Sequence, residues 1–350
     1  MSTDRGDAAL PTLLLPFGTG QLAWPANDDA LFLRARAGDA LRAIAGPRLR
    51  CEQSYKPAAD ALVREGWQVS TAEATAARYR LVLVLPPRQR QEARALLARA
   101  VACCATGGTV IACMANDEGA RSGESDLEAL AGLSGSLSKH HCRVYWSTID
   151  AATCDAGLLA QWREADSPRP ILDGRFISRP GVFAWDRIDP ASALLAEHLP
   201  TSLAGSAADL GCGYGFLAAE LLQRCPGITS LDLHEAEARA LDLAQRNLAH
   251  FAARLPLQFH WHDVTSGLPR RYDIIVTNPP FHAQGSMDRP DIGRAFIAVA
   301  ADALKPGGRL WMVANRHLPY ESVLDARFGS ARIVTQASGF KIIEAVKAGA

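Results

Sequence analysis

Residues 207–222 read AADLGCGYGFLAAELL, and this stretch decides the fold of the second half of the chain. Its apolar start predicts a buried strand, its glycines predict a tight loop, and the residues after Gly215 predict a helix. Glycines let a ligand approach the backbone more closely than a side chain would allow. Phe216 stands where the dinucleotide fingerprint G-x-G-x-x-G has its third glycine. The pattern therefore predicts an open α/β sheet that binds a nucleoside without a pyrophosphate.

Acidic side chains lie at the ends of three predicted strands. Asp209 stands at the entrance of the glycine loop, where its carboxylate can bind a cationic amine and would repel phosphates. Asp232 follows the segment 228–231 and can bind ribose hydroxyls. Asp263 follows the alternating segment 257–262 and can accept a hydrogen bond from an adenine amino group. Together they predict one nucleoside site at the carboxyl edge of the sheet.

The tetrapeptide Asn278-Pro279-Pro280-Phe281 follows the apolar run Ile274-Ile275-Val276. That segment predicts a strand covered by helices on both faces, and the prolines make its end rigid. The side-chain oxygen of Asn278 and the backbone oxygen of Pro279 can each accept one N–H of a planar amine, whose lone pair then faces an electrophile. Phe281 can stack on the attached ring. An ordinary strand-ending turn is the alternative, since Asn-Pro and Pro-Pro are frequent in loops.

These motifs, together with the turn Lys305-Pro306-Gly307-Gly308, resemble class I S-adenosylmethionine-dependent methyltransferases. The segments VANRHLPY (residues 313–320) and GFK (residues 339–341) narrow the resemblance to ribosomal RNA guanine-N2 methyltransferases of the RsmC type, and residues 176–346 match that pattern. The resemblance implies S-adenosylmethionine as cofactor. It also implies methyl transfer to the N2 amine of a guanine in ribosomal RNA, with small-subunit 16S RNA as the first choice of substrate.

The resemblance also implies a set of site residues. The cofactor-binding positions are Phe183, Asp209, Gly211, Cys212, Gly213, Gly215, Asp232, Leu233, Asp263 and Asn278. The catalytic positions are Asn278, Pro279, Pro280, Phe281 and His282. Phe183 is included because Gly181-Val182-Phe183, followed by Asp189, resembles the family's lead-in. His282 can stack on the target base, hydrogen-bond it or remove a proton after transfer, and a turn residue without a role is the alternative.

Other functions share parts of this pattern. A guanine-N2 methyltransferase of the large subunit would use the same motifs. An adenine-N6 methyltransferase acts on a similar exocyclic amine. A protein glutamine-N5 methyltransferase acts on an amide, although such enzymes usually carry Tyr where this chain has Phe281. A non-enzymatic RNA-binding assembly factor would not need a cofactor loop, so the intact loop from Asp209 to Gly215 argues against it.

A faint internal repeat relates the two halves of the chain. Residues 79–87 read YRLVLVLPP and parallel residues 272–280, which read YDIIVTNPP. In the first copy Leu85 stands in the place of Asn278, and no Asp-x-Gly-x-Gly-x-Gly loop precedes it. The first copy has therefore lost both the amide that orients an amine and the loop that holds a cofactor.

We therefore expect two tandem Rossmann-like methyltransferase-type domains of the α/β class. The N-terminal domain, residues 1–170, is expected to be a degenerate copy that supports the fold and contacts RNA. The C-terminal domain, residues 171–350, is expected to bind the cofactor on a seven-stranded, mostly parallel sheet with helices on both faces. The turn-rich segment 166–171 (DSPRPI) is the expected linker.

Composition agrees with this organisation. The chain has 350 residues, 48% of them hydrophobic, and a net charge of zero, so no global field attracts nucleic acid. Residues 34–99, however, contain thirteen Lys or Arg against six Asp or Glu. This excess predicts an RNA-facing patch, with solvated helix faces as the alternative.

Other site classes and locations are disfavoured. The eight cysteines form no C-x-x-C pair, and His260 with His262 lacks a convincing third ligand, so we expect neither disulfides nor a metal. Cys212 is expected to fill the glycine loop rather than act as a nucleophile. No apolar run reaches the roughly 20 residues of a membrane helix, and the start of the chain lacks a secretory signal. We expect a cytoplasmic, monomeric protein with no membrane contact.

Overall fold

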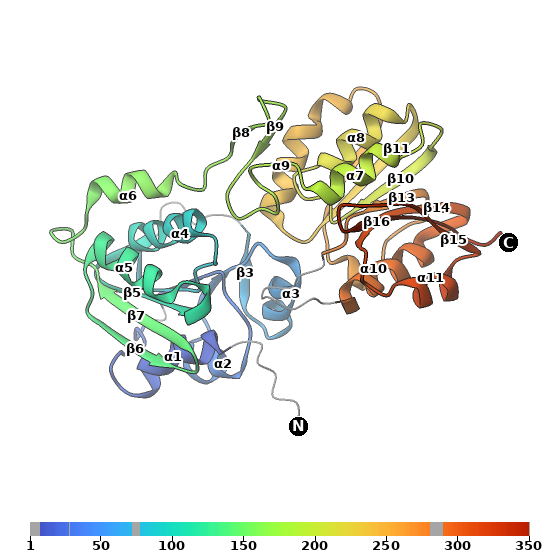
Figure 1. Cartoon of the computed structure of the whole chain (residues 1–350). Coiled ribbons are helices and arrows are strands. Elements are labelled where there is room, and N and C mark those ends of the chain that lie inside the picture. The colour runs from blue at the N-terminus through green and yellow to red at the C-terminus, as the bar shows by residue number, and fades with distance from the viewer. Residues whose placement is uncertain (1–7, 28, 72–77, 281–289, 350) are drawn as a thin grey trace. The chain divides into compact units, whose positions relative to one another are not determined.

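The computed structural model describes residues 8–27, 29–71, 78–280 and 290–349. These residues form two compact units (Figure 1). The N-terminal unit comprises Met1–Ser167 and Arg179–Gly181, and the C-terminal unit comprises Pro168–Ser178 and Val182–Ala350. The boundary at Ser167 lies within the segment 166–171. Beyond this boundary, the three residues Arg179–Gly181 belong to the N-terminal unit.

Both units are built on a seven-stranded sheet, and the two sheets have the same topology. The strand order is β3-β2-β1-β4-β5-β7-β6 in one and β12-β11-β10-β13-β14-β16-β15 in the other. The first five strands in each order pair in parallel, and the last two strands pair antiparallel. This confirms the predicted α/β class with two tandem Rossmann-like sheets.

The strand bounds follow chain order. In the N-terminal unit the strands are β1 (Ala30–Leu33), β2 (Arg50–Glu52), β3 (Gln68–Ser70), β4 (Tyr79–Val84), β5 (Cys104–Ala115), β6 (Gly135–Lys139) and β7 (Cys142–Thr148). In the C-terminal unit they are β10 (Ala204–Leu210), β11 (Gly227–Glu235), β12 (Leu257–Trp261), β13 (Tyr272–Thr277), β14 (Leu304–Asn315), β15 (Ser330–Ala337) and β16 (Phe340–Val346). A separate two-stranded sheet joins β8 (Arg169–Ile171) to β9 (Phe176–Ser178).

Helices cover both faces of each sheet. The N-terminal unit contains α1 (Ala9–Gly18), α2 (Asp39–Ile44), α3 (Lys56–Arg64), α4 (Arg90–Cys103), α5 (Ala120–Ala131) and α6 (Ala156–Arg163). The C-terminal unit contains α7 (Pro190–His198), α8 (Phe216–Arg224), α9 (Ala238–Leu248), α10 (Pro290–Ala303) and α11 (Glu321–Arg327). Short 3-10 turns are η2 (Asn116–Glu118), η3 (Ala249–Phe251) and η4 (Val264–Ser266). Among the described helices, none combines the length and the apolar character that a membrane crossing would require.

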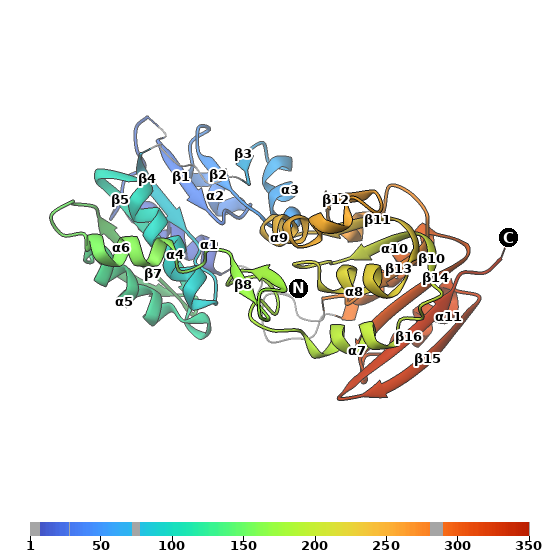
Figure 2. The ribbon, with the colours of Figure 1, turned by 90° about the horizontal axis from the view of Figure 1, so that it is seen from above.

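The central strand β13 shows why its sequence is apolar throughout. Ile274 and Val276 pack into the core beneath α7, α8 and α9, whereas Ile275 packs into the core beneath α10 and α11. Figures 1 and 2 show these two groups of helices on opposite faces of the sheet. A strand buried on both faces needs apolar side chains at consecutive positions. A polar side chain that can contact a ligand is therefore expected only after the strand ends, at Asn278.

Candidate cofactor and substrate site

The glycine loop turns sharply between β10 and α8. Gly211, Gly213 and Gly215 have φ angles of +74°, +54° and +91°, a region that side chains rarely enter. The backbone N–H of Gly211 donates to the backbone oxygen of His234 at 2.8 Å, which ties the loop to β11. Gly215 directly precedes α8 and packs against α9, where an added Cβ would lie 3.3 Å from Leu248. The glycines are thus required by backbone geometry as well as by ligand approach.

A cavity opens beside this loop at the carboxyl ends of β10 and β13. It brings together six of the predicted cofactor residues, namely Phe183, Asp209, Gly211, Cys212, Gly213 and Asn278. Gly215 contributes through the loop's shape and does not line the cavity. Tyr214, Phe216 and Leu217 add apolar surface. Phe183 lines the cavity while 68% exposed, so its ring is available to a ligand.

Asp209 gives the cavity its electrostatic character. Its side chain is 1% exposed, and neither carboxylate oxygen has a hydrogen-bond partner among the described residues. Burial raises the pKa of this carboxyl to about 8, the Glu235 carboxylate adds to the rise, and the nearby Ala218 backbone N–H only partly opposes it. An unpaired buried carboxylate is costly for the folded chain. The site therefore fits a cationic group that would restore the ionised form.

Cys212 fills the loop as a small apolar residue. It is 6% exposed, and burial raises the pKa of its thiol well above the usual range, so the nucleophilic thiolate is suppressed. All eight cysteines of the chain are free thiols.

The structure does not bring Asp232 into the cavity. Because β11 extends to Glu235, Asp232 lies inside the strand, and its side chain contacts Tyr272, which belongs to the core beneath α10 and α11. Its carboxylate accepts two hydrogen bonds from Arg270, at 2.7 and 2.6 Å, and one from the Tyr272 hydroxyl at 2.8 Å. Leu233 is fully buried in the core beneath α8 and α9. Neither residue lines the cavity.

Glu235 is the acidic residue that ends this strand. Its carboxylate accepts a hydrogen bond from the Gly213 backbone N–H at 2.8 Å, so it holds the glycine loop directly. Burial raises the pKa of the Glu235 carboxyl, although backbone N–H groups including that of Gly213 oppose the rise. Sequence reasoning placed the strand end three residues too early, because His234 and Glu235 are polar. The alternation of Leu231 and Leu233 with polar residues is the signal that could have extended the strand.

Asp263 lies at the same edge of the sheet, after β12, but it does not line the cavity. Its Oδ1 accepts hydrogen bonds from the backbone N–H and the hydroxyl of Thr265, at 2.9 and 2.7 Å. These bonds cap the η4 turn. The side chain therefore has a structural role as well as a position near the ends of β11 and β12.

Asn278 is held at the end of β13 with its amide in a fixed orientation. Its Nδ2 donates to Asp189 Oδ2 at 2.9 Å and to Ser192 Oγ at 2.8 Å. Its Oδ1 is buried and has no partner among the described residues. Pro279 is buried and Pro280 exposed, whereas the predicted Phe281 and His282 lie outside the described residues. Asn278 also lines the cavity, so its oriented amide is the candidate acceptor for an N–H of a ligand.

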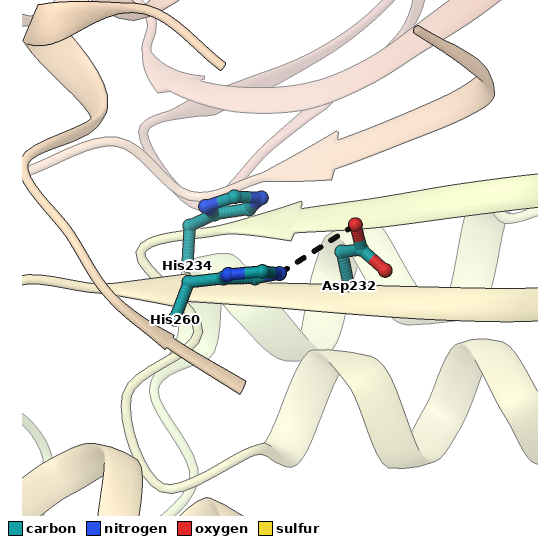
Figure 3. A group of neighbouring side chains, drawn as sticks. All are labelled: Asp232, His234 and His260. Carbon is teal, nitrogen blue, oxygen red and sulfur yellow. Dashed lines mark ion pairs between the residues drawn. The ribbon is translucent and has the colours of Figure 1, made fainter. Parts of the chain in front are cut away.

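Asp232, His234 and His260 form the one group of potential metal ligands found among the described residues (Figure 3). The two imidazole rings stack with centroids 4.5 Å apart and planes 11° apart, and His260 Nε2 lies 3.6 Å from Asp232 Oδ2. A metal ion lies in the plane of each imidazole that binds it, which two stacked parallel rings do not allow. The Arg270 guanidinium also neutralises Asp232. Burial lowers the pKa of His234 to about 3. Asp232 is instead held by hydrogen bonds from Arg270 and Tyr272, and the Tyr272 hydroxyl also lies 3.3 Å from His234 Nε2.

This chain is similar to known methyltransferases in sequence and in structure. The family model "Methyltransferase small domain" matches residues 173–344. Ribosomal RNA small subunit methyltransferase C of Yersinia enterocolitica is 34% identical over 79% of this chain and 77% of that protein. The protein of the same name from Erwinia tasmaniensis is 33% identical over 75% and 74%. A solved structure, the T. thermophilus 16S rRNA N2 G1207 methyltransferase in complex with AdoMet and guanosine, matches with a TM-score of 0.77 and 26% identity, covering 98% of this chain and 92% of that one.

Proposed function

The chain belongs to the family of the ribosomal RNA small subunit methyltransferase C proteins, and we propose that it transfers a methyl group from S-adenosylmethionine to the exocyclic N2 amine of a guanine in 16S ribosomal RNA. The observation that carries the proposal is that Asn278 and Asp209 line the same cavity, and that the Asn278 Oδ1 and the Asp209 carboxylate have no hydrogen-bond partner among the described residues. One accepts an amine N–H and the other accepts a cation. The match to a structure with AdoMet and guanosine supports guanine over adenine or glutamine as the target.

The cavity residues fit S-adenosylmethionine, whose sulfonium supplies an electrophilic methyl group. Asp209 pairs with the ammonium of the methionine part, and its carboxyl ionises on binding. The glycine loop has no side chains at Gly211 and Gly213, so the ligand can approach its backbone closely. Glu235 and Asp263, at the ends of adjacent strands, bind ribose hydroxyls and the adenine edge. Phe183 covers the ligand at the mouth of the cavity.

Positioning of the amine supplies most of the catalysis. Guanine N2 is a weak nucleophile because its lone pair is delocalised into the ring. Acceptance of its N–H groups by Asn278 Oδ1 and the Pro279 backbone oxygen favours the pyramidal, reactive geometry. As the nitrogen–carbon bond forms, the carbon–sulfur bond breaks, its electron pair stays on sulfur, and the nitrogen then loses one proton. The target base has to leave its stack or be unpaired already.

The N-terminal unit is assigned a supporting and RNA-contacting role. Several residues of its basic segment are engaged in ion pairs, including Arg94 with Asp126 and Arg99 with Glu52. Arg78, Arg80 and Arg88 remain exposed and are the better candidates for phosphate contacts. The protein acts as a cytoplasmic monomer, and the reaction requires no metal.

Transfer of labelled methyl groups tests the function. Wild-type protein and labelled S-adenosylmethionine are incubated with naked 16S RNA, naked large-subunit RNA, each assembled subunit and a glutamine-bearing release factor. We expect N2-methylguanosine in small-subunit RNA, at the position equivalent to the G1207 named for the T. thermophilus protein. N6-methyladenosine, or label in protein or large-subunit RNA, would replace the proposed substrate. Absence of both cofactor binding and transfer would favour the RNA-binding alternative, whereas cofactor binding without transfer would mean that the substrate is an assembly intermediate or requires a partner.

A further inference from the structure

We propose that Asp189 and Ser192 form a two-acceptor clamp that fixes the Asn278 amide with its oxygen facing the cavity, so that both are positioning residues for the methyl-accepting amine. The inference rests on the proposed function. It adds two residues that lie 86 and 89 positions away from Asn278 in the sequence. Neither residue touches the reacting atoms in this assignment, because each acts through Asn278.

The orientation of the amide follows from the chemistry of its partners. A carboxylate only accepts hydrogen bonds, so the face of Asn278 toward Asp189 has to be the donating nitrogen. A flip of the amide would place its oxygen against Asp189 Oδ2 at 2.9 Å, which is repulsive. Ser192 Oγ takes the second N–H at 2.8 Å. With both N–H groups used, the oxygen is left for a ligand.

The clamp is itself held rigidly by the start of α7. Asp189 is the N-cap residue of this helix, and its Oδ2 also accepts the Ser192 backbone N–H at 2.8 Å. One carboxylate oxygen therefore joins the helix start to the end of β13. All three residues line the cavity. The arrangement converts a helix cap into a support for the acceptor oxygen.

The N-terminal unit has lost every part of this clamp together. Its α1 occupies the place of α7, since both precede the first strand of their sheets. Ala8 is the residue before α1, and no side-chain hydrogen bond caps that helix. Three residues on, Pro11 stands where α7 has Ser192, and Leu85 stands where β13 is followed by Asn278. The unit without a glycine loop thus also lacks the amide and both of its acceptors.

The clamp also strengthens the acceptor. Hydrogen bonds from Nδ2 to a carboxylate polarise the amide and place more electron density on Oδ1. Methyl transfer develops positive charge on the amine nitrogen, so a more negative Oδ1 stabilises the transition state more than the ground state. We therefore expect the clamp to act on turnover rather than on cofactor affinity.

The test measures single-turnover methylation of the 16S RNA substrate, the Kd of S-adenosylmethionine by calorimetry and the unfolding temperature of the full chain. Asp189→Ala and Ser192→Ala are expected to lower the turnover rate by at least thirtyfold and fivefold, with the cofactor Kd within threefold of wild type. Ser192→Thr keeps an acceptor oxygen and is expected to restore the rate. Asp189→Asn keeps a capping oxygen but loses the charge, and an intermediate rate is expected.

Two comparisons separate positioning from a structural role. Asp155 caps α6 through the Leu158 N–H at 2.9 Å, so Asp155→Ala is a matched loss of an N-cap aspartate away from the cavity. It should lower the unfolding temperature as Asp189→Ala does, without changing turnover. In an Asn278→Ala background, Ser192→Ala is expected to cause no further loss. The clamp would be overturned if Ser192→Ala lowered turnover further in the Asn278→Ala background, or if Asp189→Ala and Ser192→Ala both kept wild-type turnover. Methylation by the wild-type protein tests the proposed function separately.

Discussion

The two units share one strand order but differ at the positions that end their central strands. By register, Leu33 of β1 and Leu210 of β10 are equivalent, because each pairs with the last residue of the neighbouring parallel strand, Val84 or Thr277. The residues beside them are Phe32 in one unit and Asp209 in the other. Topology therefore depends on the shared apolar pattern, and the chemistry depends on single positions at the sheet edge.

Arg34 shows how the N-terminal unit closes this edge. It follows β1 where Gly211 follows β10, and it keeps a left-handed backbone with a φ of +53°. Its guanidinium donates to the backbone oxygen of Leu85 at 3.3 Å. The Arg34 side chain thus bridges the ends of β1 and β4. In the corresponding place the C-terminal unit has Gly211, Gly213 and the cavity that they line. The same fold can bind a nucleoside or fill that site with its own residues.

The largest expected effect comes from giving the C-terminal unit this arginine. Gly211→Arg places a long cationic side chain at the cavity wall, and the backbone already has the left-handed conformation that Arg34 tolerates. We expect loss of S-adenosylmethionine binding by at least a hundredfold in calorimetry. Gly307→Arg, at a φ of +75° with no atom near its Cβ, is the matched control and should bind normally. Unchanged binding by Gly211→Arg would mean that the cofactor lies elsewhere.

The second change gives the C-terminal unit the leucine that follows β4, by replacing Asn278 after β13 with the equivalent of Leu85. Asn278→Leu removes the acceptor oxygen and keeps a similar side-chain volume, so we expect turnover to fall by about a hundredfold to a thousandfold. The cofactor Kd should stay within threefold, because leucine does not block the glycine loop. Rapid-quench methylation under single-turnover conditions measures the rate. A rate within threefold of wild type would exclude an orienting role for this amide.

Much of this arrangement could be predicted from the sequence, because its signals are local. The glycine loop, the Asn-Pro-Pro strand end and the repeat between residues 79–87 and 272–280 each lie within one short segment. The clamp of Asp189 and Ser192 could not be predicted, since hydrogen bonds between distant segments leave no periodic pattern. The expected strand end at Asp232 was wrong for another reason, because β11 continues to Glu235. In the sequence alone, a polar residue such as Asp232 after an apolar run resembles the end of a strand. In the structure it lies inside the strand, because Arg270 and Tyr272 satisfy its carboxylate.

Asp209 should make the affinity for S-adenosylmethionine depend on pH. The N-terminal unit has Phe32 at the equivalent position and therefore no such titrating group. Its pKa is raised to about 8 in the free protein, so below pH 8 the cavity holds mostly the protonated acid. Binding of an ammonium group requires the carboxylate, and affinity should therefore rise by roughly tenfold per pH unit from 6 toward 7.5. It should fall again above the α-amino pKa of about 8 as the ligand loses its charge.

Calorimetry in buffers of different ionisation enthalpy checks this directly, because binding at pH 7 should release close to one proton from the protein. Asp209→Asn should abolish both the proton release and the rise in affinity. The raised pKa also means that the folded free protein binds a proton more tightly than the unfolded chain, so Asp209 destabilises the fold increasingly from about pH 4 to 8. The Asn variant should therefore gain unfolding temperature at pH 8 and not at pH 4.

The smallest expected effect distinguishes the two acidic residues of β11. Gln53 follows β2 where Glu235 ends β11, and it also bridges backbone groups, donating to Ala35 at 2.8 Å and accepting from Tyr55 at 2.9 Å. Glu235→Gln should therefore preserve the loop and weaken S-adenosylmethionine binding by only about tenfold, through loss of a charged ribose acceptor. Asp232→Asn should leave the Kd within threefold and instead lower stability by about 1 to 3 kcal/mol, because it weakens the buried bonds to Arg270 and Tyr272. Calorimetry and urea unfolding of both variants measure these quantities. The reverse result, with Asp232→Asn losing affinity and Glu235→Gln losing none, would return the ribose site to Asp232 and require β11 to end earlier when the cofactor binds.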